Sequence, residues 1–186
     1  MQSINTLKLS HQIIKNHIKK GSICVDATMG RGRDTLFLCN LTDVTGKVYA
    51  FDIQKEAVES TRKLLNENGI KNAVLINDGH ENMSNYIPDG IDCFVFNLGY
   101  LPGGNHSIQT KYSTTKKALE TAMQKLKSKG IISICIYYGK DTGFEEKNKI
   151  TDYLKNIDSE NFTVILSDFI NRPNNPPLFA LIIKEK

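Results

Sequence analysis

The chain has 186 residues, a net charge of +4, 40% hydrophobic side chains and 24% charged ones. This composition can close one sizeable core and excludes intrinsic disorder and collagen-like repeats, so residues 1–186 are expected to form a single domain. No apolar run reaches the roughly 18 residues of a membrane helix, and residues 1–10 lack the charged-then-apolar order of a signal peptide, so we expect a cytoplasmic protein without membrane contact.

Short runs rich in Ile and Val alternate with segments of helical periodicity, the pattern of a parallel sheet with helices on both faces. In chain order, the predicted elements are a helix over 7–18, a strand over 22–26, a helix over 34–40, a strand over 47–52, a helix over 54–68, strands over 73–77 and 91–97, a helix from 113–115 to about 127, a strand over 131–137, a helix over 144–156, and strands over 162–169 and 178–184. Gly69 and Gly130 are expected to end the helices before them. Seven strands with a hairpin-like final pair predict an α/β fold.

The four cysteines, Cys24, Cys39, Cys93 and Cys135, lie far apart, and three of them fall inside apolar runs. This spacing favours buried reduced thiols over a disulfide framework or a zinc site. We therefore predict no metal.

The net charge is unevenly placed. Residues 1–93 carry 11 basic and 11 acidic side chains, whereas residues 94–186 carry 13 and 9. The segment 106–140 holds one acid, Glu120, and seven lysines: Lys111, Lys116, Lys117, Lys125, Lys127, Lys129 and Lys140. Such a segment would suit a polyanion such as nucleic acid, and a solvated helix face is the simpler explanation.

A glycine loop, residues 26–35, follows the first predicted strand. Gly30 and Gly32 let the backbone turn tightly near a ligand. Asp52 ends the second strand twenty residues beyond Gly32, where a carboxylate can accept both ribose hydroxyls of an adenosine cofactor. The pairing is more specific than either part.

Two cofactors fit this pairing, a dinucleotide and S-adenosylmethionine. A pyrophosphate would want a third glycine where Thr35 stands, and Asp34 at the helix start would repel it, whereas Asp26 suits a methionyl ammonium. We therefore predict S-adenosylmethionine; the alternative is that Asp26 and Asp34 only cap and position the turn. The residues expected to bind the cofactor are Asp26, Thr28, Gly30, Arg31, Gly32, Arg33, Asp34, Thr35, Asp52, Gln54, Asp78, Gly79, His80 and Asn97.

Asp78, Gly79 and His80 follow the third strand, where an adenine ring would lie against the sheet edge. We expect His80 to make a cofactor or structural contact and not to transfer a proton, because a lone histidine is more often a structural hydrogen-bonding residue.

The fourth strand ends in a loop rich in glycine, and such loops are expected to be functional or tightly turned. Its Asn97 and Tyr100 are similar to the Asn/Asp-Pro-Pro-aromatic motif of amino-group methyltransferases, with Leu98 and Gly99 in place of the prolines. In that motif the amide oxygen and a backbone carbonyl accept from the target amine, and the aromatic ring stacks on the base. We therefore assign the catalytic positions to Asn97, Leu98 and Tyr100; the alternative is an ordinary turn with Tyr100 as a lid on the cofactor.

Four strings together resemble one bacterial family. They are Asp-Ala-Thr-Met-Gly-x-Gly-x-Asp-Thr from residue 26, Ala-Phe-Asp-Ile-Gln from 50, Asn-Leu-Gly-Tyr-Leu-Pro-Gly-Gly from 97 and Asn-Asn-Pro-Pro from 174. The chain resembles the MnmM-type family, often labelled rRNA methylase. The resemblance implies a class I methyltransferase fold, which is Rossmann-like, and S-adenosylmethionine as donor. It also implies N-methylation of the 5-aminomethyl group of (2-thio)uridine at the tRNA wobble position, with the anticodon stem-loop as bound partner.

The chain departs from the family pattern at five positions. Arg31 and Arg33 stand where Asn and His are usual, Gly79 replaces Ser, Asn105 replaces Asp, and Lys140 replaces His. The chain has only four arginines, so we interpret the two in the loop as contacts to RNA phosphate or as solvated charges. The changes at the last two positions argue against an acid or base there.

A target base must be splayed out and stacked, which Tyr100, Tyr112, Tyr137 or Tyr138 could do; Tyr137 is instead expected to pack in the core. No general base is predicted, because in-line displacement depends chiefly on positioning. The residues expected to bind substrate are Gly103, Gly104, Asn105, His106, Tyr112, Lys116, Tyr138, Lys140 and Asn174. Two alternatives stay open, a class I methyltransferase for rRNA or a small amine and a non-catalytic RNA-binding module. A homodimer also stays open.

Overall fold

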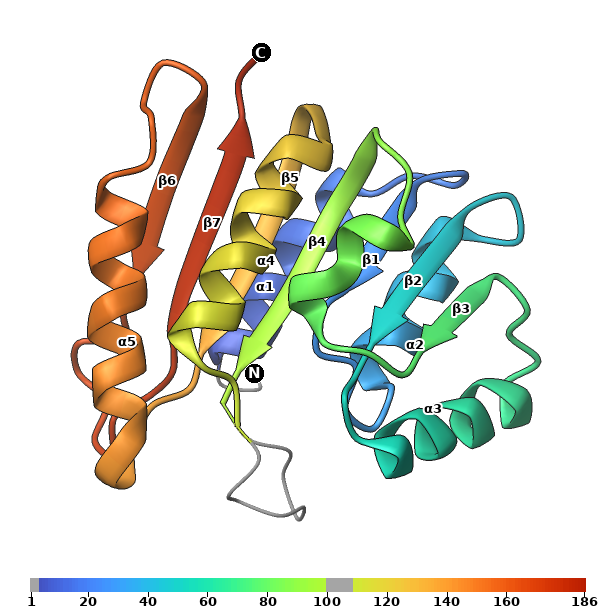
Figure 1. Cartoon of the computed structure of the whole chain (residues 1–186), viewed down its shortest axis with the longest axis horizontal. Coiled ribbons are helices and arrows are strands. Elements are labelled where there is room, and N and C mark those ends of the chain that lie inside the picture. Colours follow the sequence, from blue (N-terminus) through green and yellow to red (C-terminus); the bar gives the residue numbers. More distant parts are fainter. Residues whose placement is uncertain (1–3, 100–108) are drawn as a thin grey trace.

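The computed structural model describes residues 4–99 and 109–186, with the backbone alone at residues 140–142 (Figure 1). Its helices are α1 (Thr6–His17), α2 (Arg33–Thr42), α3 (Lys55–Glu67), the 3-10 helix η1 (His80–Asn85), α4 (Tyr112–Lys125) and α5 (Lys140–Lys155). Its strands are β1 (Ile23–Asp26), β2 (Lys47–Phe51), β3 (Ala73–Ile76), β4 (Ile91–Leu98), β5 (Leu126–Ile136), β6 (Phe162–Ser167) and β7 (Leu178–Lys184).

The strands form one sheet in the order β3-β2-β1-β4-β5-β7-β6. Strands β1 to β5 pair in parallel, whereas β7 is antiparallel to both β5 and β6. The predicted seven strands and their hairpin-like final pair are confirmed. The strand order reverses between β1 and β4, and ligands of open parallel sheets bind beyond the carboxyl ends of the strands at such a point.

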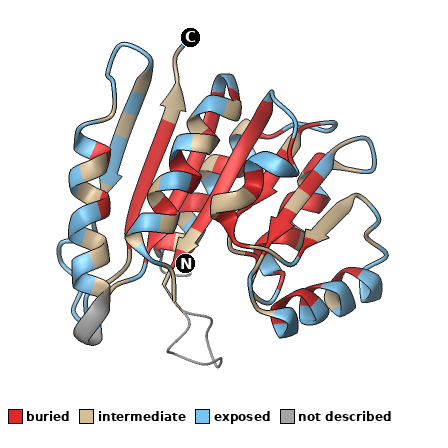
Figure 2. Cartoon of the chain, in the orientation of Figure 1, coloured by how far each residue is buried: buried red, intermediate tan, exposed pale blue. Residues whose placement is uncertain are grey.

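Helices cover both faces of the sheet, as predicted (Figure 1). Helices α4 and α5 and η1 pack on one face, and α1 and α2 pack on the other, with α3 beside α2 near the β3 edge. The central strands are buried on both sides (Figure 2). Ile132, Ile134 and Ile136 of β5 contact the α4 face, whereas Ile131 and Cys135 contact the α1 face. This two-sided burial explains the nearly continuous apolar runs of the sequence.

Helix α3 shows how the local sequence sets an element. Its buried residues Ala57, Val58, Thr61 and Leu65 recur at helical spacing, so one stripe faces the core. The helix ends as predicted at Gly69, whose φ is +68°, and the Ile70 N–H donates to the Leu65 carbonyl at 2.9 Å. This is a Schellman ending, which satisfies carbonyls that the helix leaves unpaired.

The prediction that Gly130 ends a helix is wrong. Helix α4 ends at Lys125, and Gly130 lies inside β5, next to a register shift between Ile91 and Cys93 of β4. A Cβ at Gly130 would lie 2.8 Å from Leu126 Cγ and 2.9 Å from the Lys127 carbonyl oxygen. The glycine is therefore required by close packing at a β-bulge.

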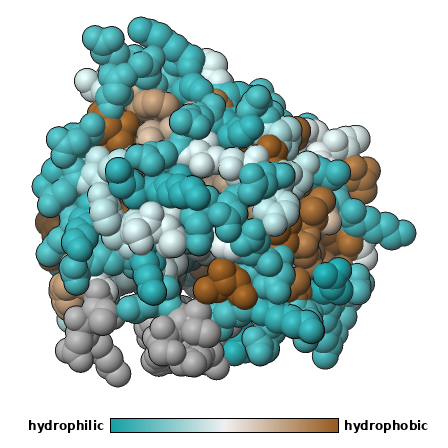
Figure 3. Space-filling model, in the orientation of Figure 1, coloured by the Kyte–Doolittle hydropathy of each residue, from teal (hydrophilic) through white to brown (hydrophobic). Residues whose placement is uncertain are grey.

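All four cysteines are buried and unpaired, and Cys24 and Cys93 are opposite one another on β1 and β4. The face seen in Figure 3 is mainly hydrophilic, with apolar side chains gathered toward the β2–β3 end. Within the described residues, no helix has the length and apolarity needed to cross a membrane.

Candidate active site

A cavity of about 740 Å³ opens beyond the carboxyl ends of β1, β2 and β4, where the strand order reverses. The structure brings most of the predicted cofactor residues together on its wall. The predicted residues that line it are Thr28, Gly30, Arg31, Arg33, Asp34, Asp52, Gln54, Asp78, Gly79, His80, Asn97 and Leu98.

Asp52 lies directly after β2 with its carboxylate fixed by the backbone. Oδ2 accepts from the Gly30 N–H at 3.0 Å, and Oδ1 accepts from the Gln54 N–H at 2.9 Å. Burial raises the pKa of Asp52, and these two hydrogen bonds oppose that rise. Because a carboxylate oxygen has more than one acceptor site, both oxygens can still accept from hydroxyl groups in the cavity.

Asp78 and His80 form the wall beyond β3. The carboxylate of Asp78 accepts from the Asn82 side chain at 2.9 Å and from the Tyr86 hydroxyl at 2.9 Å, and these contacts lower the pKa of Asp78. Nδ1 of His80 lies 3.2 Å from the Ala27 carbonyl, and its buried Nε2 has no hydrogen-bond partner in the described part of the chain. Burial lowers the pKa of His80, so its ring is neutral at pH 7. This neutral, buried ring fits the predicted contact role.

Three predicted cofactor residues, Asp26, Gly32 and Thr35, lie behind the cavity wall and do not line it. Asp26 is fully buried and accepts from the Thr35 hydroxyl at 2.7 Å and from the Thr28 N–H at 3.2 Å. Burial, followed by the charge of nearby Asp34, raises the pKa of Asp26 to about 7. Of the two aspartates in the glycine loop, Asp34 is the one that lines the cavity.

Gly32 has a packing role that differs from the expected close approach to a ligand. Its φ is +78°, and a Cβ there would lie 2.7 Å from Thr61 Cγ2 of α3. The glycine therefore allows the loop to pack against α3.

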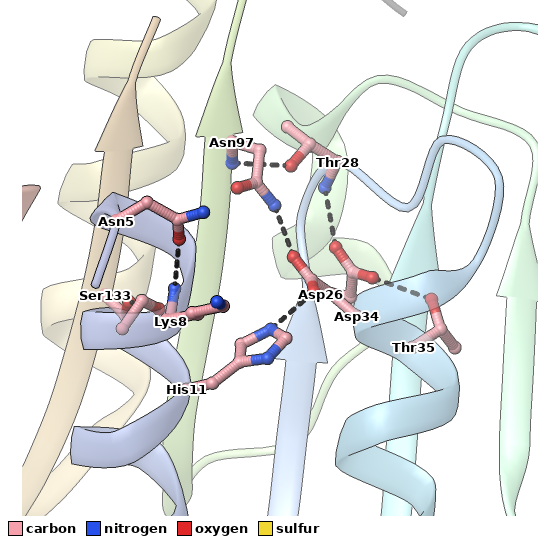
Figure 4. Close-up of polar contacts among 10 residues, drawn as sticks. Asn5, Lys8, His11, Asp26, Thr28, Asp34, Thr35, Asn97 and Ser133 are labelled. Carbon is pink, nitrogen blue, oxygen red and sulfur yellow. Dashed lines mark hydrogen bonds and ion pairs between the residues drawn. The ribbon is translucent and has the colours of Figure 1, made fainter. Parts of the chain in front are cut away.

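A chain of hydrogen bonds fixes Asn97 at the end of β4 (Figure 4). Asn97 Nδ2 donates to Asp34 Oδ2 at 2.7 Å, and the Asn97 backbone N–H donates to the Thr28 hydroxyl at 2.7 Å. His11 Nε2 lies 2.7 Å from the other oxygen of Asp34, and its ring stacks on Phe37 at 4.0 Å. Because a carboxylate only accepts, Asp34 sets which way the amide faces and leaves Asn97 Oδ1 without a partner among the described residues.

The segment after Asn97 passes close to Tyr137. The Leu98 carbonyl accepts from the Tyr137 N–H at 3.0 Å, and Gly99 has a φ of +144°. A Cβ at Gly99 would lie 3.2 Å from Tyr137 Cβ, which explains a glycine at this motif position.

The expectation that Tyr137 packs in the core is wrong. Tyr137 is 42% exposed and lines the cavity, because it lies on the α1 face of the sheet just beyond the start of that helix. Tyr138 lies instead against the core, where its ring contacts Phe144 edge-on at 5.4 Å. Tyr138, which was predicted to contact the substrate, therefore does not line the cavity, whereas its neighbour Tyr137 does.

Gly99 and Thr110, which lie on either side of residues 100–108 in the chain, are hydrogen-bonded to each other. The Gly99 N–H donates to the Thr110 hydroxyl at 2.9 Å, and the Thr110 N–H donates to the Gly99 carbonyl at 3.0 Å. The Thr110 hydroxyl donates in turn to Glu146 of α5 at 2.9 Å, and burial raises the pKa of Glu146. The predicted Tyr100, Gly103, Gly104, Asn105 and His106 lie outside the described residues, as does the side chain of Lys140.

Acidic partners neutralise much of the predicted basic segment. Lys116 pairs with Glu120 at 3.3 Å, Lys125 with Asp89 at 2.8 Å and Lys129 with Glu185 at 3.0 Å, and Lys127 pairs with Asp92. In the described structure, neither Lys116 nor the half-buried Tyr112 lines the cavity, and the exposed Asn174 lies away from it. The cations at the cavity wall are Arg31, Arg33 and Lys111, which have no ion-pair partner among the described residues.

The sequence reasoning missed His11, Thr110, Lys111 and the cavity position of Tyr137. His11 sits in a helix far from the glycine loop in sequence, so no local motif marks it. Thr110 and Lys111 lie just before α4, the helix that follows β4 in the chain, and the sequence identified Lys111 only as one of the seven lysines of the basic segment. Their place just before that helix could have identified them.

Known proteins that are similar to this chain are described as methylases or methyltransferases. A family model described as "Putative rRNA methylase" matches residues 48–183. The chain is 35% identical, over 96% of its length and 69% of the relative's, to the tRNA (mnm(5)s(2)U34)-methyltransferase, chloroplastic, of Arabidopsis thaliana. Two solved structures are also similar. One, described as a "putative rRNA-methylase" from Clostridium thermocellum, has 46% identity, a TM-score of 0.97 and coverage of 99% of this chain and 100% of that one. The other, described as "a putative methyltransferase" from Streptococcus mutans in complex with SAH, has 38% identity, a TM-score of 0.90 and coverage of 98% and 99%.

Proposed function

The chain belongs to the rRNA methylase family of S-adenosylmethionine-dependent methyltransferases, and from this we propose that it methylates a tRNA wobble uridine. The acceptor is the 5-aminomethyl nitrogen of (2-thio)uridine, and the product is 5-methylaminomethyl-(2-thio)uridine. The observation that carries the proposal is Asn97, held at the switch point of the sheet with its amide oxygen unpartnered among residues 4–99 and 109–186, beside a cavity lined by the Asp52 carboxylate. The relative named for this tRNA position matches nearly the whole chain.

The cavity residues fit S-adenosylmethionine. Asp52 would accept from the ribose hydroxyls, as the carboxylate after the second strand does in related sheets. Asp78 offers an acceptor for the adenine amine, the neutral ring of His80 lines the same part of the cavity, and Asp34 places negative charge near the methionyl end. When bound, S-adenosylmethionine supplies an electrophilic methyl group on a positively charged sulfur.

Asn97 and Leu98 are the proposed acceptors for the target amine. Within the described part of the chain Asn97 Oδ1 has no partner, and the Leu98 carbonyl accepts from the Tyr137 N–H alone and so keeps one acceptor site. Two acceptors that take the two amine hydrogens would orient the nitrogen lone pair. Such positioning can supply several kcal/mol of a displacement barrier.

The amine must also be neutral to attack. An alkylamine has a pKa of ~10.4, so only on the order of one molecule in 10³ to 10⁴ is neutral at pH 7. Acceptors at Asn97 and Leu98 can bind the neutral amine and also the charged one, and it is the positive sulfur that disfavours the charged form. No general base is assigned, since in-line displacement depends chiefly on positioning, and the contacts of Asp34 with His11 and Asn97 serve to orient the Asn97 amide.

The RNA part of the proposal is supported by Arg31, Arg33 and Lys111, cations on the cavity wall that form no ion pair with any residue the structure describes. They would contact phosphates beside the target nucleotide. The predicted contacts at residues 100–106 and at Lys140 remain part of the proposal. We also place the activity in the cytoplasm, where tRNA and reduced thiols such as these four cysteines occur together.

The test is methyl transfer from labelled S-adenosylmethionine to bulk tRNA from cells that lack this protein, followed by nucleoside mass spectrometry. We expect methylaminomethyl uridine to appear as its aminomethyl precursor disappears. Ribosomal RNA from the same cells is the matched control, because the family description names it. Label in ribosomal RNA and none in tRNA would overturn the tRNA assignment.

A further inference from the structure

A second cavity of about 230 Å³ lies beside the candidate active site. Its wall includes Leu7 of α1, Tyr137 after β5, Phe169 and Arg172 in the turn after β6, and the pair 176–177 before β7. The Thr6 hydroxyl donates to the Pro177 carbonyl at 2.6 Å and so ties the start of α1 to this pair.

The two cavities share a wall, because Leu7 and Tyr137 line both. They also share the carboxyl edge of the sheet, toward which the heads of β2, β4 and β6 all point in Figure 1. The cofactor residues occupy the β1–β3 part of this edge, and Asn97 lies at β4. The second cavity lies at the part of the edge formed by β5, β6 and β7, so Asn97 lies between it and the cofactor residues. A substrate bound at Asn97 would extend toward this cavity.

The chemistry of this cavity suits a nucleobase. Its wall offers the flat aromatic rings of Phe169 and Tyr137 and the apolar rings of two prolines, and the Arg172 guanidinium lies 5.0 Å from the centre of the Phe169 ring. Unpaired bases stack on aromatic rings and on arginine planes, and a guanidinium also attracts the phosphate backbone. No acidic residue lines the cavity among the described residues.

The backbone before β7 is shaped to build this wall. Asn174 and Asn175 both have left-handed angles, with φ of +66° and +49°, and they turn the chain before the two prolines. Asparagine tolerates this conformation better than most residues. The predicted Asn174 thus acts through the backbone, and its side chain does not line the cavity.

We propose that the second cavity holds the base of the nucleotide next to the methylated one in the single-stranded RNA loop, with Tyr137 between the two bases. The inference rests on the proposed function and names the part of the RNA that this surface recognises. It assigns stacking to Phe169 and Arg172, two residues outside the methyl-transfer site.

The test uses a synthetic anticodon stem-loop with 5-aminomethyluridine at the wobble position, and two versions that are abasic at the preceding or the following nucleotide. The variants are Phe169→Ala and, because Arg172 is exposed and its loss spares the core, Arg172→Gln. Ile170→Ala is the matched control, because Ile170 is 93% exposed in the same turn and does not line the cavity.

We expect both variants to raise KM for the intact stem-loop about tenfold, the usual scale of one stacked base, with kcat and S-adenosylmethionine binding unchanged. For one of the two abasic stem-loops, the KM of wild type should also rise about tenfold. The KM of Phe169→Ala for that stem-loop should rise little above its value for the intact stem-loop. Equal losses for wild type and variant on both abasic stem-loops would overturn this inference and leave the proposed function standing. No methylation of the intact stem-loop by wild type would overturn both.

Discussion

The two halves of the carboxyl edge are built differently. On the cofactor half, at β1 to β3, the carboxylate of Asp52 is held by backbone N–H groups within its own strand–loop segment and the neighbouring loop. On the substrate half, at β4 to β7, Asn97 depends on Asp34 and His11, and Thr110 depends on Glu146. The first half is organised by short segments, and the second by contacts between distant segments. The difference indicates that substitutions on the two halves should affect different steps.

Asn97→Ala should have the largest effect and should change the chemical step. Loss of one preorganised hydrogen-bonding group from an active site costs about 100-fold or more in kcat. Equilibrium binding of S-adenosylmethionine should stay within about threefold of wild type. Single-turnover methylation of tRNA, together with calorimetric titration, measures both. A comparable loss in cofactor affinity would place Asn97 on the cofactor half and break the comparison.

Asp52→Asn should do the reverse. An amide cannot accept at both positions, so one N–H of Gly30 or Gln54 would face an NH₂ group. Hydrogen bonds to charged groups contribute about 1.5–3 kcal/mol, so the dissociation constant for S-adenosylmethionine should rise about 10- to 100-fold. The rate at saturating cofactor should change little. Asp89→Asn, at an exposed pair with Lys125, is the control, and equal affinities in the two variants would contradict the prediction.

His11→Leu tests the long-range support of Asn97. Leucine keeps apolar contact with Phe37 but removes the donor to Asp34, so the Asn97 amide is less fixed. We expect kcat to fall about tenfold, the scale of one hydrogen bond, with no change in cofactor affinity.

His11→Gln should restore most of this activity, because its amide can donate to the same carboxylate. His17→Gln, at the far end of α1, serves as the control. If the leucine and glutamine variants were equally slow, His11 would support the fold and not the orientation of Asn97.

Asp26→Asn should give the smallest effect, seen as a pH dependence of stability. In the folded protein the pKa of Asp26 is raised from 3.8 to about 7, so between these values the folded state holds a proton that the unfolded chain has released. Stability from this group is therefore complete below about pH 4 and is lost as pH rises toward 7. Melting temperatures measured from pH 5 to 8 without cofactor should fall less in Asp26→Asn than in wild type, by a few degrees. Parallel curves would show that Asp26 titrates normally.

Local patterns predicted most of the fold. Apolar runs and glycine stops located all seven strands, and Gly69 ended α3 as predicted. The prediction that Gly130 ends a helix was wrong because a close approach at a bulge and a helix ending both favour glycine. Only the pairing with the neighbouring strand distinguishes the two.

Residues of the candidate site were likewise predicted where a local sequence position marks them and missed where their role depends on tertiary packing. Asp52 and Asn97 were found because Asp52 directly follows β2 and Asn97 lies at the carboxyl end of β4, positions visible in the sequence. His11 and Tyr137 were missed because their roles depend on how α1 is placed over β5, a tertiary contact that no short pattern encodes. Asp26 was expected at the ligand, and its depth behind the wall depends equally on tertiary packing.

The four buried cysteines give this protein an internal reporter of unfolding. Only a thiolate that solvent can reach is alkylated. Burial raises the pKa of Cys39 and Cys135 to about 12, and the contact with Cys93, followed by burial, raises the pKa of Cys24 well above its usual range. Cys24 and Cys93 lie opposite each other on the two strands that flank the switch point, in the apolar cluster under α1 and α2, so they become exposed only when this face of the sheet is uncovered. The rate of thiol labelling would therefore follow the opening of this part of the core in the unmodified protein.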